Sequence, residues 1–427
     1  MIIMKKILKT ILCISASLSM CIPSLADASS ALTNKGYQLK QVLIMSRHNV
    51  RSPLAGKGSF AEAVTPHQWF NWTAPAGQLS LHGGVAETIM GQYFRKYLED
   101  EKFIPENWVP ADGEARFYAN SYQRTIATAQ YFSSGMLPIA NVKIEHKMAL
   151  NAKDPVFLPP TELTPAELQT GIDYVNGLCN GKGLSQVGVE LADDFKRMEK
   201  MLDFKKSAYA KEHNIKAIDR EDWHIELKGK NKNIIANKGI TRNMASVSDT
   251  LMMQYYETPT SKSAAWGNDK SKGAWKSVGK ILTTYGDVDF KNPPVARIIA
   301  RNLLKEMDAE LNTNGRKFTL LLGHDTNIST LLAALEAKEY TLPGTVAYKS
   351  PIGGKILIEK RLGPDGVTYA AVNMVYASDK QMRDLEQLSL ANPPMIYPLE
   401  FKALQKNADG LYRYDDLISL FRKTYQY

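Results

Sequence analysis

Three short stretches of the chain are apolar, rich in β-forming residues, and bounded by polar residues or glycine. They are residues 38–46, 115–119 and 318–323. The first and the last lack regular polar alternation, which is typical of parallel strands covered by helices on both faces. We therefore expect all three to lie within one sheet.

Each predicted strand is followed by apolar residues at i, i+3 and i+4 spacing, which is the pattern of an amphipathic helix. These helices are expected over residues 84–98, 125–132 and 328–336. Strands that alternate with helices predict an α/β fold, with a mostly parallel sheet and helices on both faces.

The middle of the chain has a different composition. It is rich in Lys, Glu and Met, has few strand-like runs, and shows helical patterns at 188–201 and 247–257. We predict a helical insertion, or cap, over 151–290, which divides the α/β domain into residues 27–150 and 291–427.

A basic, Asn-rich stretch within the insertion, residues 228–238, is expected to be a solvated loop. Without interleaved aromatic residues it is poor support for binding nucleic acid, so we expect no nucleic-acid partner.

The first residues have the pattern of an export signal. Lys5, Lys6 and Lys9 precede an apolar run over 11–22, and small residues precede a plausible cut after Ala26. The run is shorter than the roughly 20 residues of a membrane span. We expect residues 1–26 to be a signal peptide that directs the protein to the periplasm, with no membrane association of the mature chain.

Loss of this leader changes the composition. The 427-residue chain has a formal net charge of +9, and removal of three lysines lowers it to +6. Cys13 and Cys21 leave as well, so Cys179 remains alone and cannot form an internal disulfide. We expect Cys179 to be a buried thiol, and the fold to be stabilised by its apolar cores.

Arg47, His48 and Arg51 directly follow the first predicted strand. Ligands of open α/β sheets bind outside the carboxyl ends of the strands. A guanidinium group donates two parallel hydrogen bonds to phosphate oxygens, so this grouping favours a phosphate site. The alternative is a basic surface turn with a structural histidine.

His324 and Asp325 follow the last predicted strand in the same way, and Arg124 follows the middle one. Asp325 could instead simply cap the next helix, and Arg124 could lie on the surface. Together with the first group, however, these residues describe phosphate-ester hydrolysis. His48 would attack phosphorus, and Asp325 would protonate the leaving group if it remains protonated near working pH.

Other catalytic motifs are absent from the sequence. The seven histidines form no H-E-x-x-H pair and no Cys/His cluster, and there is no P-loop, G-x-G-x-x-G turn or G-x-S-x-G elbow. These absences lower the support for a zinc protease, a nucleotide-binding protein and a serine hydrolase.

The motifs R-H-N-V-R-S-P at 47–53 and G-H-D-T-N at 323–327 resemble those of the histidine acid phosphatase family, and the similarity extends over most of the mature chain. The resemblance implies a phosphoglycerate-mutase-like α/β domain with a helical cap. It also implies a mechanism that needs neither a metal ion nor a cofactor, with a phosphohistidine at His48 and a proton donor at Asp325. The phosphate ligands that it implies are Arg47, Arg51, Arg124 and His324.

Asn49 stands where most members of the family have Gly, which resembles the branch that acts on sugar phosphates. The resemblance therefore implies a small-molecule phosphate monoester as substrate, such as glucose 1-phosphate. A phytase-like inositol-polyphosphate phosphatase and a non-catalytic phosphosugar-binding protein are the alternatives. The sequence departs from the family in two respects. Members of the family have disulfides that a single cysteine cannot form, and residues 200–245 match the family poorly.

The sequence is compatible with both a monomer and a homodimer.

Overall fold

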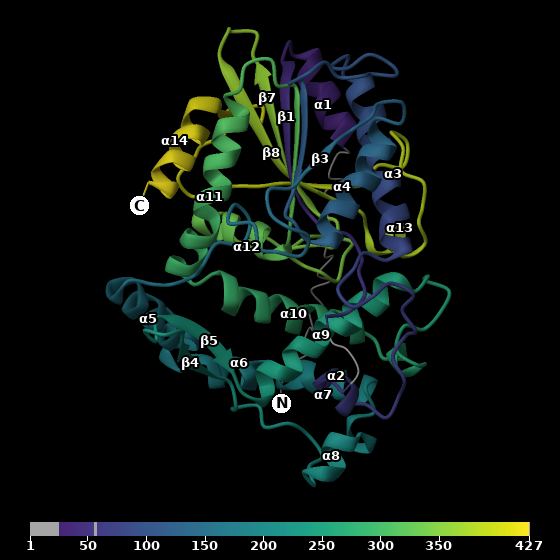
Figure 1. Cartoon of the computed structure of the whole chain (residues 1–427), viewed down its shortest axis with the longest axis vertical. Coiled ribbons are helices and arrows are strands. Elements are labelled where there is room, and N and C mark those ends of the chain that lie inside the picture. The colour runs from purple at the N-terminus through teal and green to yellow at the C-terminus, as the bar shows by residue number, and fades with distance from the viewer. Residues whose placement is uncertain (1–24, 55–57, 427) are drawn as a thin grey trace, which may run out of the picture.

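The computed structural model describes residues 25–54 and 58–426, so nearly all of the predicted leader lies outside the described residues. Figure 1 shows a sheet with helices on both sides, and below it a separate group of helices. The predicted α/β fold is confirmed.

The central sheet is mixed, with strand order β10-β8-β7-β1-β6-β2-β3 and β9 paired to β8. Strands β1, β6, β2 and β3 run parallel, whereas β7, β8, β9 and β10 add antiparallel pairs. The strands are β1 (Gln38–Arg47), β2 (Ala115–Ala119), β3 (Ile144–Glu145), β6 (Phe318–Gly323), β7 (Lys355–Leu362), β8 (Thr368–Tyr376), β9 (Met395–Pro398) and β10 (Tyr412–Arg413). The three predicted strands are therefore found, and β1 is one residue longer.

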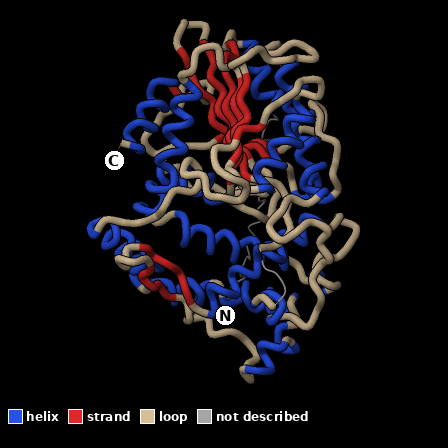
Figure 2. The backbone as a smooth tube through the Cα atoms, in the orientation of Figure 1, coloured by secondary structure: helices blue, strands red, loops and turns tan. Residues whose placement is uncertain are grey.

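The unbroken apolar run of β1 has a simple cause, because both faces of the sheet are covered. Val42 and Ile44 pack with one helical layer, and Leu43 and Met45 with the other. The first layer contains α1 (Leu25–Asn34), α3 (Leu81–Asp100) and α4 (Gln123–Met136); the second contains α11 (Pro293–Leu311), α12 (Asp325–Ala334) and α14 (Tyr414–Tyr425). Figure 2 shows the strands between these layers.

The helices below the sheet have a core of their own, which includes Phe195, Trp223 and Leu251. They are α2 (Phe60–Ala63), α5 (Pro165–Gly181), α6 (Gly183–Glu190), α7 (Ala192–Met201), α8 (Ala208–Glu212), α9 (Ile240–Glu257) and α10 (Ala274–Phe290). The short helix α13 (Asp379–Arg383) packs against α9, and its Met382 belongs to the same core. The helix predicted over 188–201 is two helices, because Leu191 leaves helical geometry and separates α6 from α7.

The solvated loop predicted over 228–238 is wrong. Strands β4 (His224–Lys228) and β5 (Ile234–Lys238) pair antiparallel, and Gly229 turns between them with φ +87°. The many Lys and Asn residues of this stretch interrupt the alternation of apolar and polar residues that would predict strands. Ile235 packs against Gly171 of α5, so burial against the cap stabilises this hairpin.

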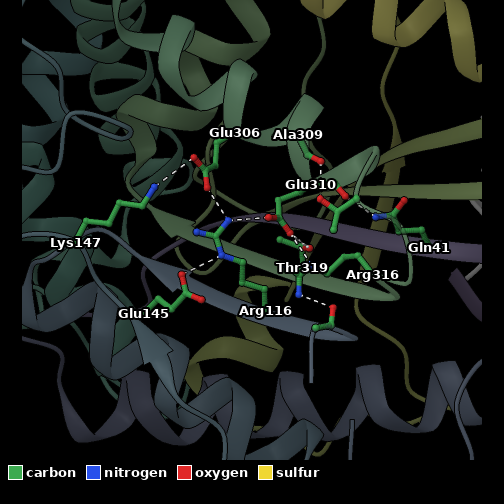
Figure 3. Close-up of polar contacts among 11 residues, drawn as sticks. Gln41, Arg116, Glu145, Lys147, Glu306, Ala309, Glu310, Arg316 and Thr319 are labelled. Carbon is green, nitrogen blue, oxygen red and sulfur yellow. Dashed lines mark hydrogen bonds and ion pairs between the residues drawn. The ribbon is translucent and has the colours of Figure 1, made fainter. Parts of the chain in front are cut away.

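An ion-pair network joins the amino end of β2 to the helical layer (Figure 3). The Arg116 guanidinium lies 2.6 Å from Glu306, 2.7 Å from Glu310 and 3.0 Å from Glu145. Burial opposes its charge, but these carboxylates outweigh burial and raise the pKa of Arg116. The network therefore holds α11 against β2 at the end opposite the predicted site.

None of the helices among the described residues combines the length and apolar character needed to cross a bilayer. Cys179 is a free, half-buried thiol at a kink in α5. Burial and the neighbouring Glu190 raise its pKa, so it remains protonated near neutral pH.

Candidate active site

His48 lies at the carboxyl end of β1 and is almost fully buried. Its Nδ1 is 2.8 Å from the carbonyl oxygen of Asn49. A carbonyl oxygen can only accept, so Nδ1 carries the proton and the lone pair of the neutral ring is on Nε2. Burial and the positive charges of nearby arginines, Arg124 first, hold the pKa of His48 well below its usual value. The His48 ring is therefore neutral in mild acid.

Three arginines converge beside this ring. Arg47 donates to the carbonyl oxygen of Ser350 at 2.5 Å, and Arg51 to Asp249 at 2.9 Å. The Arg124 guanidinium lies 4.7 Å above the ring of Tyr122. Burial and the charge of Arg51 lower the pKa of Arg124 to about 10. Like charges held together in a buried site favour an anionic ligand.

His324 is oriented by Asn120. The Asn120 side-chain oxygen accepts two backbone N–H groups, so its amide nitrogen faces His324 Nε2 at 2.7 Å. Nε2 therefore accepts, and the proton of the neutral ring is on Nδ1. The Arg124 nitrogen that lies 3.4 Å from Nδ1 is itself only a donor, so in this tautomer the two groups do not hydrogen-bond to each other. Burial and Arg124 lower the pKa of His324 to about 3. His324 thus presents an N–H donor on the side of the arginines.

Asp325 is the first residue of α12 and its side chain is 38% exposed. One carboxylate oxygen lies 3.1 Å from Arg47. Burial alone would raise the pKa of Asp325, but the charge of Arg47 and the hydrogen bond from the Thr326 N–H outweigh burial, and the pKa is lowered. The sequence-based condition that Asp325 stays protonated is therefore not met before a ligand binds, because Arg47 stabilises the carboxylate.

The turn that carries these groups is tightly packed. A Cβ at Gly323 would lie 2.4 Å from Asn327 Oδ1 and 2.9 Å from Met45 Cε. Asn327 Oδ1 accepts the backbone N–H of His324 at 2.9 Å, which caps α12 from within its first turn. Only glycine at 323 allows this close approach.

All six predicted site residues line one cavity of about 450 Å³. They are Arg47, His48, Arg51, Arg124, His324 and Asp325. The carboxyl ends of β1, β2 and β6 bring them together, since these strands are neighbours in the parallel part of the sheet. Within the described part of the chain, no group of three or more His, Cys, Asp or Glu side chains is placed to hold a metal ion.

The rest of the cavity lining comes mainly from the cap and was not predicted. Asp249 and Arg242 of α9 and Tyr285 of α10 line it, together with Lys349. Arg242 donates to the Tyr285 hydroxyl at 2.7 Å. Nothing in the local pattern of α9 distinguishes Asp249 from a solvated helical acid, so only the packing of the cap shows its place.

Comparison with known proteins agrees with this geometry. Residues 38–171 match the family model of the histidine phosphatase superfamily (branch 2). The glucose-1-phosphatase of Salmonella typhimurium is 33% identical over 424 residues, covering 97% of this chain and 100% of that protein. The phytase AppA of Escherichia coli is 26% identical over 92% of this chain and 94% of its own length. The structure of Hafnia alvei phytase superposes with a TM-score of 0.82 at 24% identity, over 91% of this chain and 97% of that one.

Proposed function

Since the chain belongs to branch 2 of the histidine phosphatase superfamily, we propose that it hydrolyses sugar phosphates, with glucose 1-phosphate as reference substrate, through a phosphohistidine on His48. The observation that carries this proposal is the convergence of three arginines on a neutral, oriented histidine. A relative that covers nearly the whole chain is named for glucose 1-phosphate.

In the first step, the substrate phosphate binds among Arg47, Arg51 and Arg124. The Nδ1–H of His324 donates to a phosphoryl oxygen. His48 Nε2 forms a bond to phosphorus as the ester P–O bond breaks. Fixed cationic donors stabilise the charge of the transferred group without reorganisation.

The leaving sugar oxygen takes its proton from Asp325. The carboxylate is ionised in the free enzyme, and a phosphate monoester has a second pKa near about 6, so the substrate monoanion can bring the proton with it. Bound phosphate also competes for Arg47 and places negative charge near Asp325, which raises the pKa of that carboxyl. In the second step Asp325 accepts a proton from water, which attacks the phosphohistidine and releases phosphate and neutral His48.

The charge of the cavity wall supports a substrate with one phosphate. Five cationic side chains stand against three carboxylates, a formal balance of +2. The carboxylates are Asp249, Asp287 and Asp325. A balance of +2 suffices for one phosphate group, and it does not match several phosphates on one ring.

An inositol polyphosphate is the second candidate, because a relative of 26% identity is named a phytase. Arg242 and Lys349, which line the same cavity, could receive a further phosphate. Lys349, however, already lies 2.8 Å from Asp287 and 2.9 Å from Glu339, so its charge is balanced.

The test is a substrate panel on the chain without residues 1–26. We expect kcat/KM for glucose 1-phosphate to exceed that for inositol hexakisphosphate, with no loss of activity in a chelator. His48→Ala should abolish turnover, and an alkaline quench should trap phosphohistidine in the parent enzyme only. The opposite substrate preference supports the phytase-like candidate. Binding of glucose 1-phosphate without hydrolysis overturns the catalytic proposal.

The place of action is part of the same proposal. The basic and apolar leader of residues 1–26 supports export to the periplasm. Activity in the osmotic-shock fraction of a host that expresses the full chain, and its retention in the cytoplasm when the leader is deleted, would test this.

A further inference from the structure

A buried ion pair adjoins the turn that carries His48. Lys355, the first residue of β7, lies 2.6 Å from one carboxylate oxygen of Glu87 on α3. It also donates to Ser46 Oγ at 2.9 Å and to the carbonyl oxygen of Gly353 at 3.1 Å. The side chains of Lys355 and Glu87 are 0% and 1% exposed. A buried ion pair is weak support for stability, because desolvation offsets the attraction, so its presence here calls for another reason.

The second oxygen of Glu87 connects this pair to the nucleophile through Asn49. Asn49 Nδ2 donates to Glu87 at 2.8 Å, and Asn49 Oδ1 accepts the Val50 N–H at 2.8 Å. The Asn49 backbone N–H donates to Thr128 Oγ1 at 3.2 Å, and its carbonyl oxygen is the acceptor for His48 Nδ1. Every polar group of Asn49 is therefore paired.

We propose that Asn49, Glu87 and Lys355 are positioning residues that fix the tautomer and orientation of His48. The proposal rests on the assignment of His48 as nucleophile. A carboxylate can only accept, so Glu87 fixes which way the Asn49 amide points. Lys355 pairs with the other carboxylate oxygen of Glu87 at 2.6 Å and holds it in place. The anchored Asn49 then holds its carbonyl oxygen toward Nδ1, which leaves Nε2 unprotonated for the attack on phosphorus.

The loop that contains Gly353 packs closely against Asn49 and His48. Gly353 has φ +66°, and a Cβ there would lie 2.7 Å from Asn49 Nδ2. Its N–H donates to the His48 carbonyl oxygen at 3.2 Å. The backbone of His48 and the side chain of Asn49 are thus held by one loop, and Lys355 ties that loop to Glu87.

Two double variants test the network. Glu87→Met with Lys355→Met removes both charges and the acceptor for Asn49. Glu87→Gln with Lys355→Met also removes both charges but keeps an amide oxygen that can accept from Asn49. Loss of orientation at a reacting atom costs about tenfold or more in rate. We therefore expect kcat of the Met/Met variant to fall about tenfold below that of the Gln/Met variant, with KM within about twofold.

The tautomer of the His48 ring can be measured directly, and it would not change if the three residues only stabilised the fold. Nitrogen-15 spectra of histidine-labelled protein should show His48 as the Nδ1–H tautomer in the parent and Gln/Met proteins, and as a tautomer mixture in the Met/Met variant. If the double variants do not fold, Asn49→Ala, which leaves the ion pair intact, should give the same loss of kcat and the same mixture.

Equal kcat and an unchanged tautomer in the folded variants overturn the positioning role. That outcome differs from failure of the proposed function. In the latter case the parent enzyme itself lacks phosphatase activity, or His48→Ala retains it.

Discussion

Asp325→Asn tests the proton donor directly. The substitution keeps the size of the side chain at the start of α12 but removes the acidic proton. It also removes the partner that lies 3.1 Å from Arg47, which remains buried and still donates to Ser350. Freed from this competition, Arg47 binds phosphate at least as well as before. We therefore expect kcat to fall while KM stays equal or decreases.

The magnitude depends on the leaving group. General-acid catalysis contributes about 10²–10⁴-fold, or about 2.7–5.4 kcal/mol of barrier. That loss applies to a sugar alkoxide, which is a poor leaving group. The p-nitrophenolate anion is stable without a proton, so its release should slow less than about tenfold. The ratio of kcat/KM for the two substrates should thus shift by about tenfold or more.

The assay is steady-state kinetics of both substrates on the parent enzyme and on Asp325→Asn. Asp249→Asn is the matched control, because it removes a carboxylate from the same cavity that pairs with Arg51 at 2.9 Å. The control should show no dependence on the leaving group. Because Asp325 is also the base in hydrolysis of the phosphohistidine, the comparison uses kcat/KM, which reports the steps up to release of the leaving group. An equal loss of kcat/KM for both substrates in Asp325→Asn, or a kcat/KM for glucose 1-phosphate within about threefold of the parent, refutes the assignment of Asp325 as proton donor.

Three further predictions follow from the same structure. Because His324 has a pKa of about 3 and the pKa of His48 is well below its usual value, both stay neutral in mild acid. Activity should persist at pH 4.5 and fall toward pH 3 as His324 protonates. It should also fall above about pH 6, as the substrate loses its proton. A kcat/KM profile in which activity already falls when the pH is lowered through 6.5 contradicts this. Gly323→Ala should destabilise the fold by about 1–3 kcal/mol through overpacking against Asn327 and Met45, and should reduce kcat by displacing His324; unaltered urea unfolding would count against it. Arg116→Met should lower the free energy of unfolding by about 3 kcal/mol, since it leaves Glu306 and Glu310 without this partner, yet leave kcat within about twofold; a large loss of kcat would show that this distant end of β2 affects the site.

The sequence by itself determined the parts of the site that depend on strand ends. Residues 47–51 and 323–325 follow two strongly apolar strands, and position 124 follows a third, so the rule for parallel sheets predicted that they meet. The position of each of these side chains depends only on residues next to it in the sequence and on the adjacent strand of the sheet. For the same reason the three strands were predicted to within one residue.

Only the tertiary structure decided what surrounds that site. Asp249 and Arg242 reach the cavity because the cap packs over the strand ends, and no local pattern along α9 encodes that contact. The hairpin of β4 and β5 was missed because it is stabilised by packing against another element of the cap, helix α5. The charge state of Asp325 could not be predicted from its residue type or its motif. Arg47, which is far from it in the sequence, lies 3.1 Å from its carboxylate in the fold and lowers the pKa of that carboxyl. A pKa depends on the charges and solvent within a few ångströms, and folding brings these together from remote parts of the chain.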